Sequence, residues 1–300
     1  MNLNERQLIT YVCDGDIRLA KEQARIIAAA NRSQKDADFC RRVINQLDRD
    51  PTAVKLPREV DGLLIQENMT EFPSNRFILR RDEEKIAVKV LNAYKVASEL
   101  KSMGVKYQPS VILHGPSGTG KTMLARYIAH KAQLPFLYVN FSHLVNSHLG
   151  ETQSNIGRIF KYARSLPCVL CFDEIDAIGM CRGQEHDVGE MARVVIALMQ
   201  EMDRLPNELI VIGTTNRFDR LDPALIRRFT LSHEVPVLHD NEILCLAEKF
   251  FRSTGTSTEE WLEEWCRKNF SCLESAANVV NKCTEKLVSD VLKRMEDKEE

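Results

Sequence analysis

The chain has 300 residues, of which 44% are hydrophobic and 28% are charged, so it has the composition of a globular protein with ample material for a core. Lysine and arginine number 41 against 43 aspartate and glutamate residues, a net charge of −2, and this balance lacks the basic surplus typical of a nucleic-acid-binding surface. The first residues do not follow the basic-then-apolar order of a secretory signal, and no apolar run approaches the roughly 18 residues that a membrane span needs.

Residues 1–50 are predicted to form an N-terminal helical segment. Apolar residues recur at three- and four-residue steps from Ile17 to Ile27, directly after Asp16, which is a suitable N-cap. Residues 51–75 contain several prolines and few periodic apolar positions, so they are predicted to be a linker.

Strands and helices alternate over residues 76–236. After a helix over 83–103, we expect strands at 111–115, 136–141, 169–174 and 208–216, with helices between them at 121–133, 155–164 and 189–205. Each strand is nearly all apolar, which indicates an α/β fold with a parallel sheet covered on both faces. After Pro236 the strand pattern stops, and residues 237–300 are predicted to be a small all-helical domain.

Nine cysteines are scattered along the chain without a regular framework, which suits a reducing compartment, and we expect a cytoplasmic location. Cys168 and Cys171 form a C-x-x-C, but Val169 and Leu170 between them are apolar. A redox-active pair needs an exposed helix start. The pair is therefore predicted to be buried strand residues.

A glycine-rich loop, GPSGTGKT, follows the first of these strands and opens the next helix. Its glycines let the backbone point N–H groups at phosphate oxygens, and the helix N-terminus adds a favourable dipole. Lys121 is placed to reach the β- and γ-phosphates, and the hydroxyl of Thr122 to ligate magnesium. The sequence predicts a nucleotide-phosphate site made of Gly115, Pro116, Ser117, Gly118, Thr119, Gly120, Lys121, Thr122 and Met123.

Polar residues end two other predicted strands. Asp173 and Glu174 directly follow the apolar run VLCF, and Asn216 ends ELIVIGTTN. The carboxyl ends of parallel strands meet at one edge of a sheet, so these side chains should emerge beside the phosphate loop. We expect Asp173 to hold a magnesium shell, Glu174 to activate or orient the attacking water, and Asn216 to bind the water or the γ-phosphate. By itself, an asparagine after a strand is more often a turn residue.

The stretches GPSGTGKT, CFDEIDAI and TTNRFDRLDPALIRRF (214–229) together resemble the AAA family of the AAA+ superfamily, in the protein-remodelling clade that includes katanin, spastin, Vps4 and the FtsH ATPase module. The resemblance implies a P-loop NTPase large domain with a small helical lid, ATP and Mg²⁺ as cofactors, and a homo-oligomer, expected to be a hexamer. It also implies that Asn216 is sensor 1 and that Arg227 and Arg228 are arginine fingers, which reach the ATP of a neighbouring subunit and act with Lys121 and Glu174. Arginines supplied in trans would neutralise charge that develops on the transferring phosphoryl group.

Two features depart from that family pattern. The segment resembling its first pore loop reads His148, Leu149 and Gly150, where the family has an aromatic residue first. A histidine grips less apolar surface on a threaded chain, so threading of a protein substrate and a plain loop histidine both stay open. In the small domain, Ser275, Ala276 and Ala277 occupy the segment that is serine-glycine-alanine in the family and that packs near the adenine, so an alanine, Ala276, stands where the family has glycine and Ala277 is an expected nucleotide contact.

Three functions compete at this point. The first is an oligomeric ATP-driven protein remodeller, with the N-terminal helices either binding an adaptor or packing as a helical layer. The second is an AAA+ loader or regulator acting on nucleic acid, which the near-neutral charge disfavours. The third is a nucleotide-dependent scaffold, which Glu174 and Asn216 disfavour because they are residues that hydrolysis requires.

Overall fold

The computed structural model describes residues 3–13, 23–24, 26–28, 36, 56–57, 59–67, 69, 72–141, 144, 151–178, 188–258 and 261–296. The chain separates into two compact units, Met1–Lys55 and Leu56–Glu300. The first unit contains helix α1, Leu3–Cys13. No helix in the described ranges is both long and apolar enough to cross a membrane.

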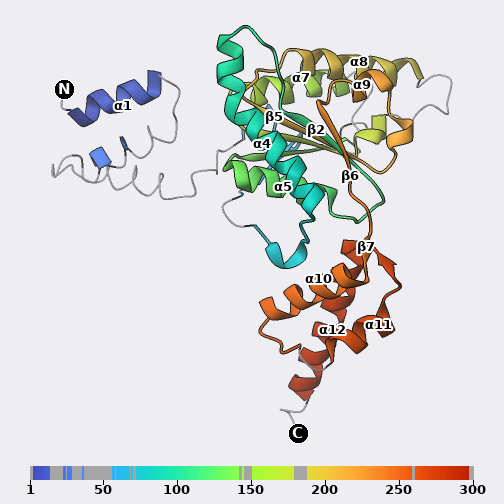
Figure 1. Cartoon of the computed structure of the whole chain (residues 1–300). Coiled ribbons are helices and arrows are strands. Elements are labelled where there is room, and N and C mark those ends of the chain that lie inside the picture. Colours follow the sequence, from blue (N-terminus) through green and yellow to red (C-terminus); the bar gives the residue numbers. More distant parts are fainter. Residues whose placement is uncertain are drawn as a thin grey trace. The chain divides into compact units, whose positions relative to one another are not determined.

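The second unit is built on a sheet of six strands, in the order β1, β3, β4, β5, β2, β6. Three of them, β5, β2 and β6, are labelled in Figure 1. The strands are β1 (Ile65–Glu67), β2 (Ser110–His114), β3 (Phe136–Asn140), β4 (Val169–Asp173), β5 (Ile210–Thr215) and β6 (Leu231–Glu234). Strand β1 pairs antiparallel with β3, and the other neighbouring strands are parallel. The loops that follow β2, β4 and β5 therefore emerge at one edge of the sheet.

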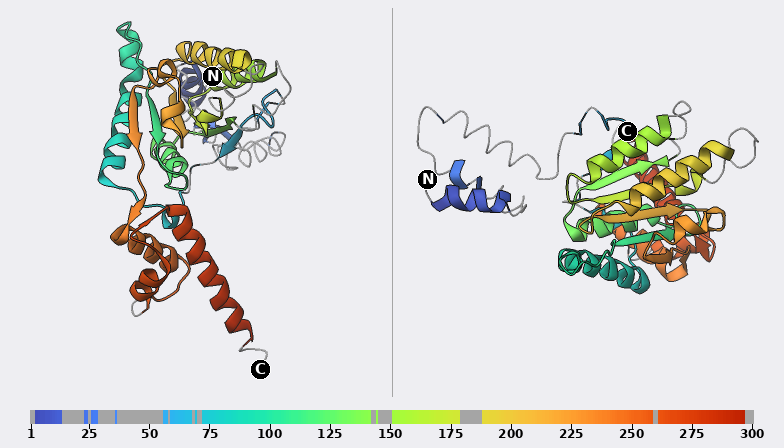
Figure 2. Two further views of the ribbon diagram at one scale, coloured as in Figure 1. Left: turned by 90° about the vertical axis from the view of Figure 1, so that its right-hand side faces the viewer. Right: turned by 90° about the horizontal axis from the view of Figure 1, so that it is seen from above.

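Helices pack on both faces of this sheet (Figure 2). One apolar cluster contains α4 (Arg81–Ser102) and α5 (Lys121–Ala132), and the other contains α7 (Glu151–Ala163) and α8 (Val188–Asp203). Successive residues of β2 join opposite clusters, since Val111 and Leu113 belong to the first and Ile112 to the second. Because side chains alternate across a strand, a central strand must be apolar on both faces.

The α/β architecture is confirmed, including the strands expected around residues 111–115, 136–141, 169–174 and 208–216. Two strands of this six-stranded sheet were not predicted. Strand β1 lies inside the stretch 51–75 that was predicted to be a linker, and β6 lies in a segment with no continuous apolar run. Both are short, and their main-chain groups pair with β3 and β2, which are distant in the sequence. Such long-range pairing overrides local propensity.

The C-terminal helices have an apolar core of their own. They are α10 (Asp240–Ser253), α11 (Leu262–Asn269) and α12 (Ala276–Glu296), and they pack around the fully buried Phe251. The prediction that this segment is all-helical is wrong in one respect. Strands β7 (Leu238–His239) and β8 (Leu273–Glu274) form a short antiparallel ladder within it. The chain entering α10 and the chain entering α12 run side by side there, and pairing satisfies their backbone groups.

Candidate functional site

The loop from Gly115 to Lys121 has the backbone that its glycines permit. Gly115, Gly118 and Gly120 have φ angles of +137°, +74° and +103°, which side chains on L-residues rarely allow. A Cβ on Gly115 would overlap the carbonyl oxygen of Val235, and one on Gly118 would lie 3.0 Å from Cβ of Ala277. Gly115 and Gly118 therefore need glycine for close approach as well as for conformation, and Gly120 needs it for conformation alone.

Lys121 lies at the first position of α5 and its side chain is 7% exposed. Its Nζ donates hydrogen bonds to the carbonyl oxygens of Gly115 and Pro116, at 2.9 and 2.7 Å, and to Oδ1 of Asn216 at 2.6 Å. Burial lowers the pKa of the ammonium group, with the negative charge of Asp173 acting in the opposite direction. The ammonium group of Lys121 thus connects the phosphate loop to the residue that follows β5.

Asp173 ends β4 and accepts hydrogen bonds from three hydroxyls. Thr122 donates to Oδ1 at 2.9 Å, Thr214 also donates to Oδ1, and Tyr138 donates to Oδ2 at 2.8 Å. The carboxylate that the sequence expected to hold a magnesium shell is therefore next to the threonine expected as a magnesium ligand. Tyr138 and Thr214 were not anticipated by the sequence.

Glu174 follows β4 with a φ of +54°, a left-handed conformation that is uncommon for a residue other than glycine. Its backbone N–H donates to the hydroxyl of Thr214 on β5 at 3.3 Å. The side chain is exposed at the edge of the cavity described below. Residues held in such sparsely populated conformations cluster at functional sites.

A cavity of about 390 Å³ lies between the phosphate loop and the start of α12. It brings together most of the predicted site residues: Ser117, Gly118, Thr119, Gly120, Lys121, Thr122, Met123, Asp173, Glu174, Asn216 and Ala277. Ala277 also donates its backbone N–H to the carbonyl oxygen of Gly118 at 3.0 Å. The cavity is lined as well by residues that sequence reasoning missed, among them Arg76, Ile78, Arg80 and Asn281.

The two predicted arginine fingers do not line this cavity, and their environments differ. The side chain of Arg227 is exposed, and it has no ion pair within the described ranges. Arg228 donates to the carbonyl oxygen of Ala224 at 2.7 Å and forms an ion pair with Asp203 at 3.3 Å. Both follow the short helix α9 (Pro223–Ile226), so the sequence LDPALI forms a capped turn that presents them.

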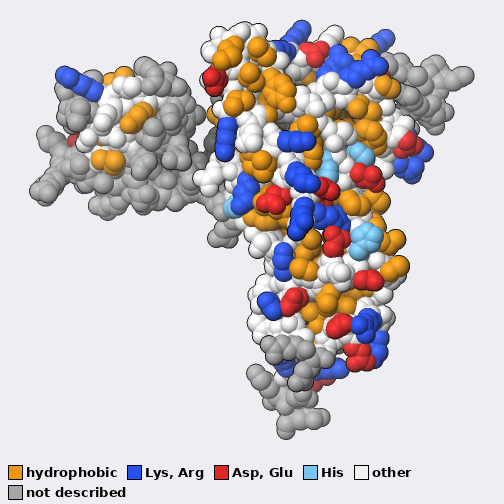
Figure 3. Space-filling view, viewed as in Figure 1, with side chains coloured by type: hydrophobic (Ala, Val, Ile, Leu, Met, Phe, Trp, Pro, Cys, Tyr) orange, Lys and Arg blue, Asp and Glu red, His pale blue; other side chains and the backbone are white. Residues whose placement is uncertain are grey.

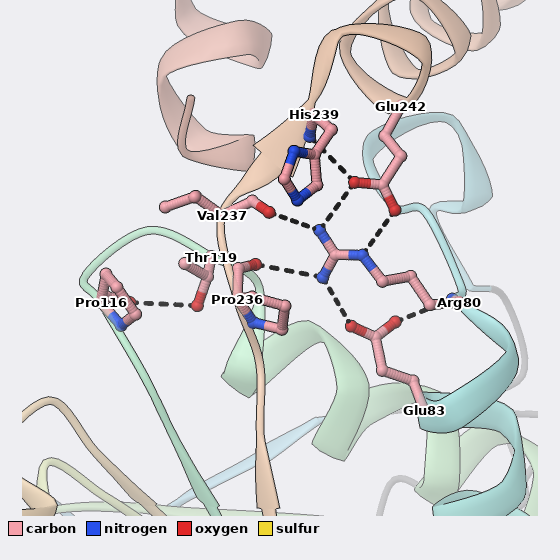
Figure 4. A network of polar contacts seen from close by, with 8 residues as sticks. All are labelled: Arg80, Glu83, Pro116, Thr119, Pro236, Val237, His239 and Glu242. Carbon is pink, nitrogen blue, oxygen red and sulfur yellow. Dashed lines mark hydrogen bonds and ion pairs between the residues drawn. The ribbon is translucent and has the colours of Figure 1, made fainter. Parts of the chain in front are cut away.

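Arg80, the residue before α4, lines the cavity and contacts α10 and the segment that leads into α10 (Figure 4). Its guanidinium donates two hydrogen bonds to Glu242, at 2.6 and 3.0 Å, and one to Glu83 at 3.0 Å. It also donates to the carbonyl oxygens of Pro236 and Val237 at 3.0 and 2.8 Å. Arg80 thus binds α4, the connecting segment and α10 together, a role that the sequence did not indicate.

Two other predicted features are the pore loop and the C-x-x-C pair, and the structure describes only the second of them. The expected pore-loop residues His148, Leu149 and Gly150 lie outside the described residues. Cys168 and Cys171 are confirmed as buried strand-region residues, and burial raises the pKa of both thiols. They are therefore unsuited to redox chemistry.

A family model described as "ATPase family associated with various cellular activities (AAA)" matches residues 111–237. The matched segment runs from β2 to just beyond β6. It contains the phosphate loop, Asp173, Glu174, Asn216 and both arginines. The chain carries an AAA ATPase domain.

The sequence is also similar to proteins that are named as ATPases or as a nucleotidase. Peroxisomal ATPase pex6 of Schizosaccharomyces pombe is 44% identical over 135 residues, which are 43% of this chain and 14% of that protein. The proteasome-activating nucleotidase of Methanosphaerula palustris is 36% identical over 192 residues, 60% of this chain and 47% of that protein. The AAA family ATPase y4kL of Sinorhizobium fredii is 29% identical over 237 residues, 76% and 71% of the two chains. The match thus spans only a small part of the peroxisomal relatives.

The cavity of the AAA domain has donors that suit magnesium together with a nucleotide. Mg²⁺ prefers hard oxygen ligands, and it commonly takes one or two from the protein and others from phosphates and water. Thr122 and Asp173 supply a hydroxyl and a carboxylate within hydrogen-bonding distance of each other. Among the described residues there is no group of three or more His, Cys, Asp and Glu side chains that could hold a metal ion by itself. The hydroxyl of Thr122 and the carboxylate of Asp173 therefore fit a magnesium ion whose other ligands are phosphate oxygens and water.

Proposed function

We propose that this protein hydrolyses ATP in the cavity between the phosphate loop and α12, with Mg²⁺ as cofactor. The observation that carries the proposal is the 2.9 Å hydrogen bond from Thr122 to Asp173, with Lys121 bound to Asn216 in the same cavity. This arrangement joins a cation, a hydroxyl, a carboxylate and an amide at the edge where β2, β4 and β5 end. A phosphoryl group bound there would meet positive charge and fixed polar groups, which is what phosphoryl transfer requires.

Each of these side chains has a distinct role in the proposal. Lys121 neutralises charge on the β- and γ-phosphates, and Thr122 and Asp173 hold the metal and its water shell. Bound Mg²⁺ supplies charge neutralisation on the phosphoryl oxygens. Glu174 orients the attacking water and accepts its proton, and Asn216 hydrogen-bonds the water or the γ-phosphate. Burial of Lys121 strengthens its interaction with phosphate because less water screens the charge.

A second copy of the chain completes the site in this proposal. Arg227 is exposed and outside the cavity of its own subunit, as a finger that acts in trans must be. Arg228 is partly engaged by Asp203 and Ala224, which supports a role in holding the turn that presents Arg227. The expected assembly is a hexamer, with ATP sites at its subunit interfaces.

The work performed by hydrolysis is proposed to be remodelling of a protein substrate. One relative is named for activating the proteasome, and that name suits a protein partner. Residues 148–150 are the proposed contact with substrate, and the N-terminal helices the proposed adaptor site. On the face drawn in Figure 3, lysine and arginine side chains of the second unit are interspersed with acidic ones. The described residues on that face form no continuous basic surface for nucleic acid.

The test is a substrate trap in the full chain. The Glu174→Gln variant should bind ATP, stop turnover and retain its substrate in a pull-down from a cell extract. A Lys121→Ala/Glu174→Gln double variant, which should lose ATP binding, is the matched control. Protein retained only by the single variant supports the remodeller.

Two outcomes favour the alternatives. Nucleic acid retained in place of protein would favour an AAA+ loader or regulator. If the unsubstituted chain binds ATP but does not hydrolyse it at any protein concentration, the chain is a nucleotide-dependent scaffold, and the proposed hydrolysis is wrong.

A further inference from the structure

Tyr138 fixes one side of the carboxylate at the centre of the site. Its hydroxyl donates to Oδ2 of Asp173 at 2.8 Å, while Thr122 and Thr214 both donate to Oδ1. A carboxylate has roughly four lone-pair sites, about two on each oxygen. The threonines therefore occupy Oδ1, and Tyr138 takes part of the capacity of Oδ2. The orientation of the carboxylate is set from both of its oxygens.

The register of the sheet explains why a tyrosine reaches this position. Tyr138 is the strand partner of Cys171, and Asn140 is the partner of Asp173. Tyr138 and Asp173 are thus separated by one strand, about 4.8 Å, and by two residues along the strand, about 6.6 Å. They share a face of the sheet because side chains alternate. A serine at position 138 would be too short to bridge this diagonal, and phenylalanine would reach without a donor.

Arg126 restricts the tyrosine ring. Its guanidinium carbon lies 5.9 Å from the centroid of the Tyr138 ring and 5.7 Å from that of Phe136. The same guanidinium makes a bidentate contact with Glu67 on β1, at 2.6 and 2.7 Å. The hydrogen bond with Glu67 raises the pKa of Arg126. A planar cation held on one side by a carboxylate packs firmly against an aromatic ring.

These contacts connect α5 to Asp173 in two ways, directly through Thr122 and indirectly through Arg126 and Tyr138. Thr122 and Arg126 are four residues apart on that helix and therefore lie on one side of it. Thr122 contacts Asp173, Asp173 accepts from Tyr138, and Tyr138 packs under Arg126. The helix that begins at the phosphate loop is thus tied at two points to the carboxylate and to the residue that orients it.

We propose that Tyr138 is a positioning residue for the magnesium-binding carboxylate, and that the Glu67–Arg126 pair fixes Tyr138 in turn. The inference rests on the proposed function, since it takes Asp173 as the side chain that holds the metal's water shell. In this proposal Tyr138 acts through Asp173 and does not contact the nucleotide. Its loss should therefore weaken the effect of magnesium on ATP binding without changing metal-free ATP binding. Outer hydrogen bonds of this kind typically contribute about 10- to 100-fold in metal affinity.

The experiment measures ATP binding in a full chain that does not consume ATP. In the Glu174→Gln background, the Kd for a fluorescent ATP analogue is determined in EDTA and across a magnesium series. The Kd in EDTA divided by the Kd at the highest magnesium concentration is the ratio that reports how strongly magnesium favours nucleotide binding. Tyr138→Phe should reduce this ratio about tenfold and raise the magnesium concentration for half-maximal effect. The Kd in EDTA should stay unchanged.

Tyr127→Phe is the matched control. It removes a hydroxyl from the residue next to Arg126, and that hydroxyl makes no hydrogen bond within the described part of the chain, where the ring packs on Phe72. The ratio should stay at its starting value in this variant. A Tyr138→Phe ratio equal to that of the control overturns the inference. An equal weakening in EDTA also overturns it, because it assigns Tyr138 to the structure of the pocket as a whole.

Failure of the proposed function has a different signature. In that case the Glu174→Gln chain itself shows no effect of magnesium on ATP binding.

The Glu67→Gln variant tests whether the Glu67–Arg126 pair fixes Tyr138, because Glu67 pairs with Arg126 and does not line the cavity. A change in the ratio in the same direction as Tyr138→Phe, but smaller, is expected. No change in Glu67→Gln contradicts the role of the Glu67–Arg126 pair.

Discussion

Lys121 donates a 2.6 Å hydrogen bond from Nζ to Oδ1 of Asn216, although 95 positions separate the two residues in the sequence. The lysine begins α5 and the asparagine follows β5, and β5 lies next to β2 in the sheet. The amide thereby faces the cation that is proposed to receive the phosphates. This contact makes the end of β5 part of the nucleotide site.

The first prediction concerns Asn216. Replacement by alanine should lower the steady-state rate of ATP hydrolysis roughly 100-fold, as removal of one preorganised polar group at a reacting centre typically does. The Kd for ATP should change far less, because Lys121 keeps its contacts to the loop carbonyls. Turnover assays and equilibrium binding on the same preparation check this. Full activity in Asn216→Ala would assign the asparagine to the turn alone.

The second prediction separates the two arginines. Arg227→Ala should abolish turnover with little change in melting temperature, because this side chain is exposed and has no ion pair in the described ranges. Arg228→Ala should also lower the melting temperature, because it removes the contacts to Asp203 and Ala224.

Mixing experiments test whether Arg227 acts in trans. Inactive Arg227→Ala mixed with inactive Glu174→Gln should regain part of the activity, since one mixed interface carries both intact groups. Activity per subunit of the unsubstituted chain should also rise with protein concentration. The idea of a shared site fails if mixing restores nothing and the specific activity is independent of concentration.

The third prediction concerns Gly213 in β5. A Cβ there would lie 2.8 Å from Cζ of Phe229, a buried ring that directly follows the paired arginines. Gly213→Ala should destabilise the fold by about 1–3 kcal/mol through overpacking. Gly157→Ala is the matched control, because its Cβ meets nothing within 4 Å and alanine favours the helix by about 1 kcal/mol. Denaturant unfolding of both variants measures the difference. Equal stability of the two would show that Phe229 moves without cost.

The fourth prediction concerns the pH dependence of the contact between Arg80 and Glu242. The hydrogen bond from Arg80 lowers the pKa of Glu242 below its ordinary value of 4.5. A carboxyl whose pKa is lowered by folding stabilises the protein above its unfolded pKa, and this contribution disappears as the pH falls through the folded pKa. Glu242→Gln should therefore cost about 1–2 kcal/mol at pH 7 and progressively less below about pH 4.5.

Melting temperatures across that pH range check the prediction. Glu248→Gln on the same helix is the matched control, because Glu248 is more exposed and pairs with Arg252 along the helix surface. Such surface pairs contribute little. This account of the Arg80–Glu242 contact is contradicted by a loss of stability in Glu242→Gln that stays constant from pH 7 to pH 4, or by an equal loss in Glu248→Gln.

The sequence by itself determined the parts of this protein that depend on neighbouring residues. The glycines and Lys121 of the phosphate loop lie within one short stretch of sequence, 115–121, so their spacing alone indicates the chemistry. Apolar strands separated by helices indicate a parallel sheet, and the polar residues at the strand ends, Asp173 and Asn216, follow from that pattern. Burial of Cys168 and Cys171 was equally readable from the apolar run that contains them.

The tertiary structure alone decided which distant residues complete the site. Tyr138 reaches Asp173 only because β3 lies beside β4 in a particular register, and Arg80 reaches Glu242 only because the segment just before α4 packs against α10. Strand β1 forms because the edge of β3 offers unpaired backbone groups, although its own three residues carry no strand signal. Register and long-range pairing depend on how the whole chain packs, and no local pattern of residue types encodes them.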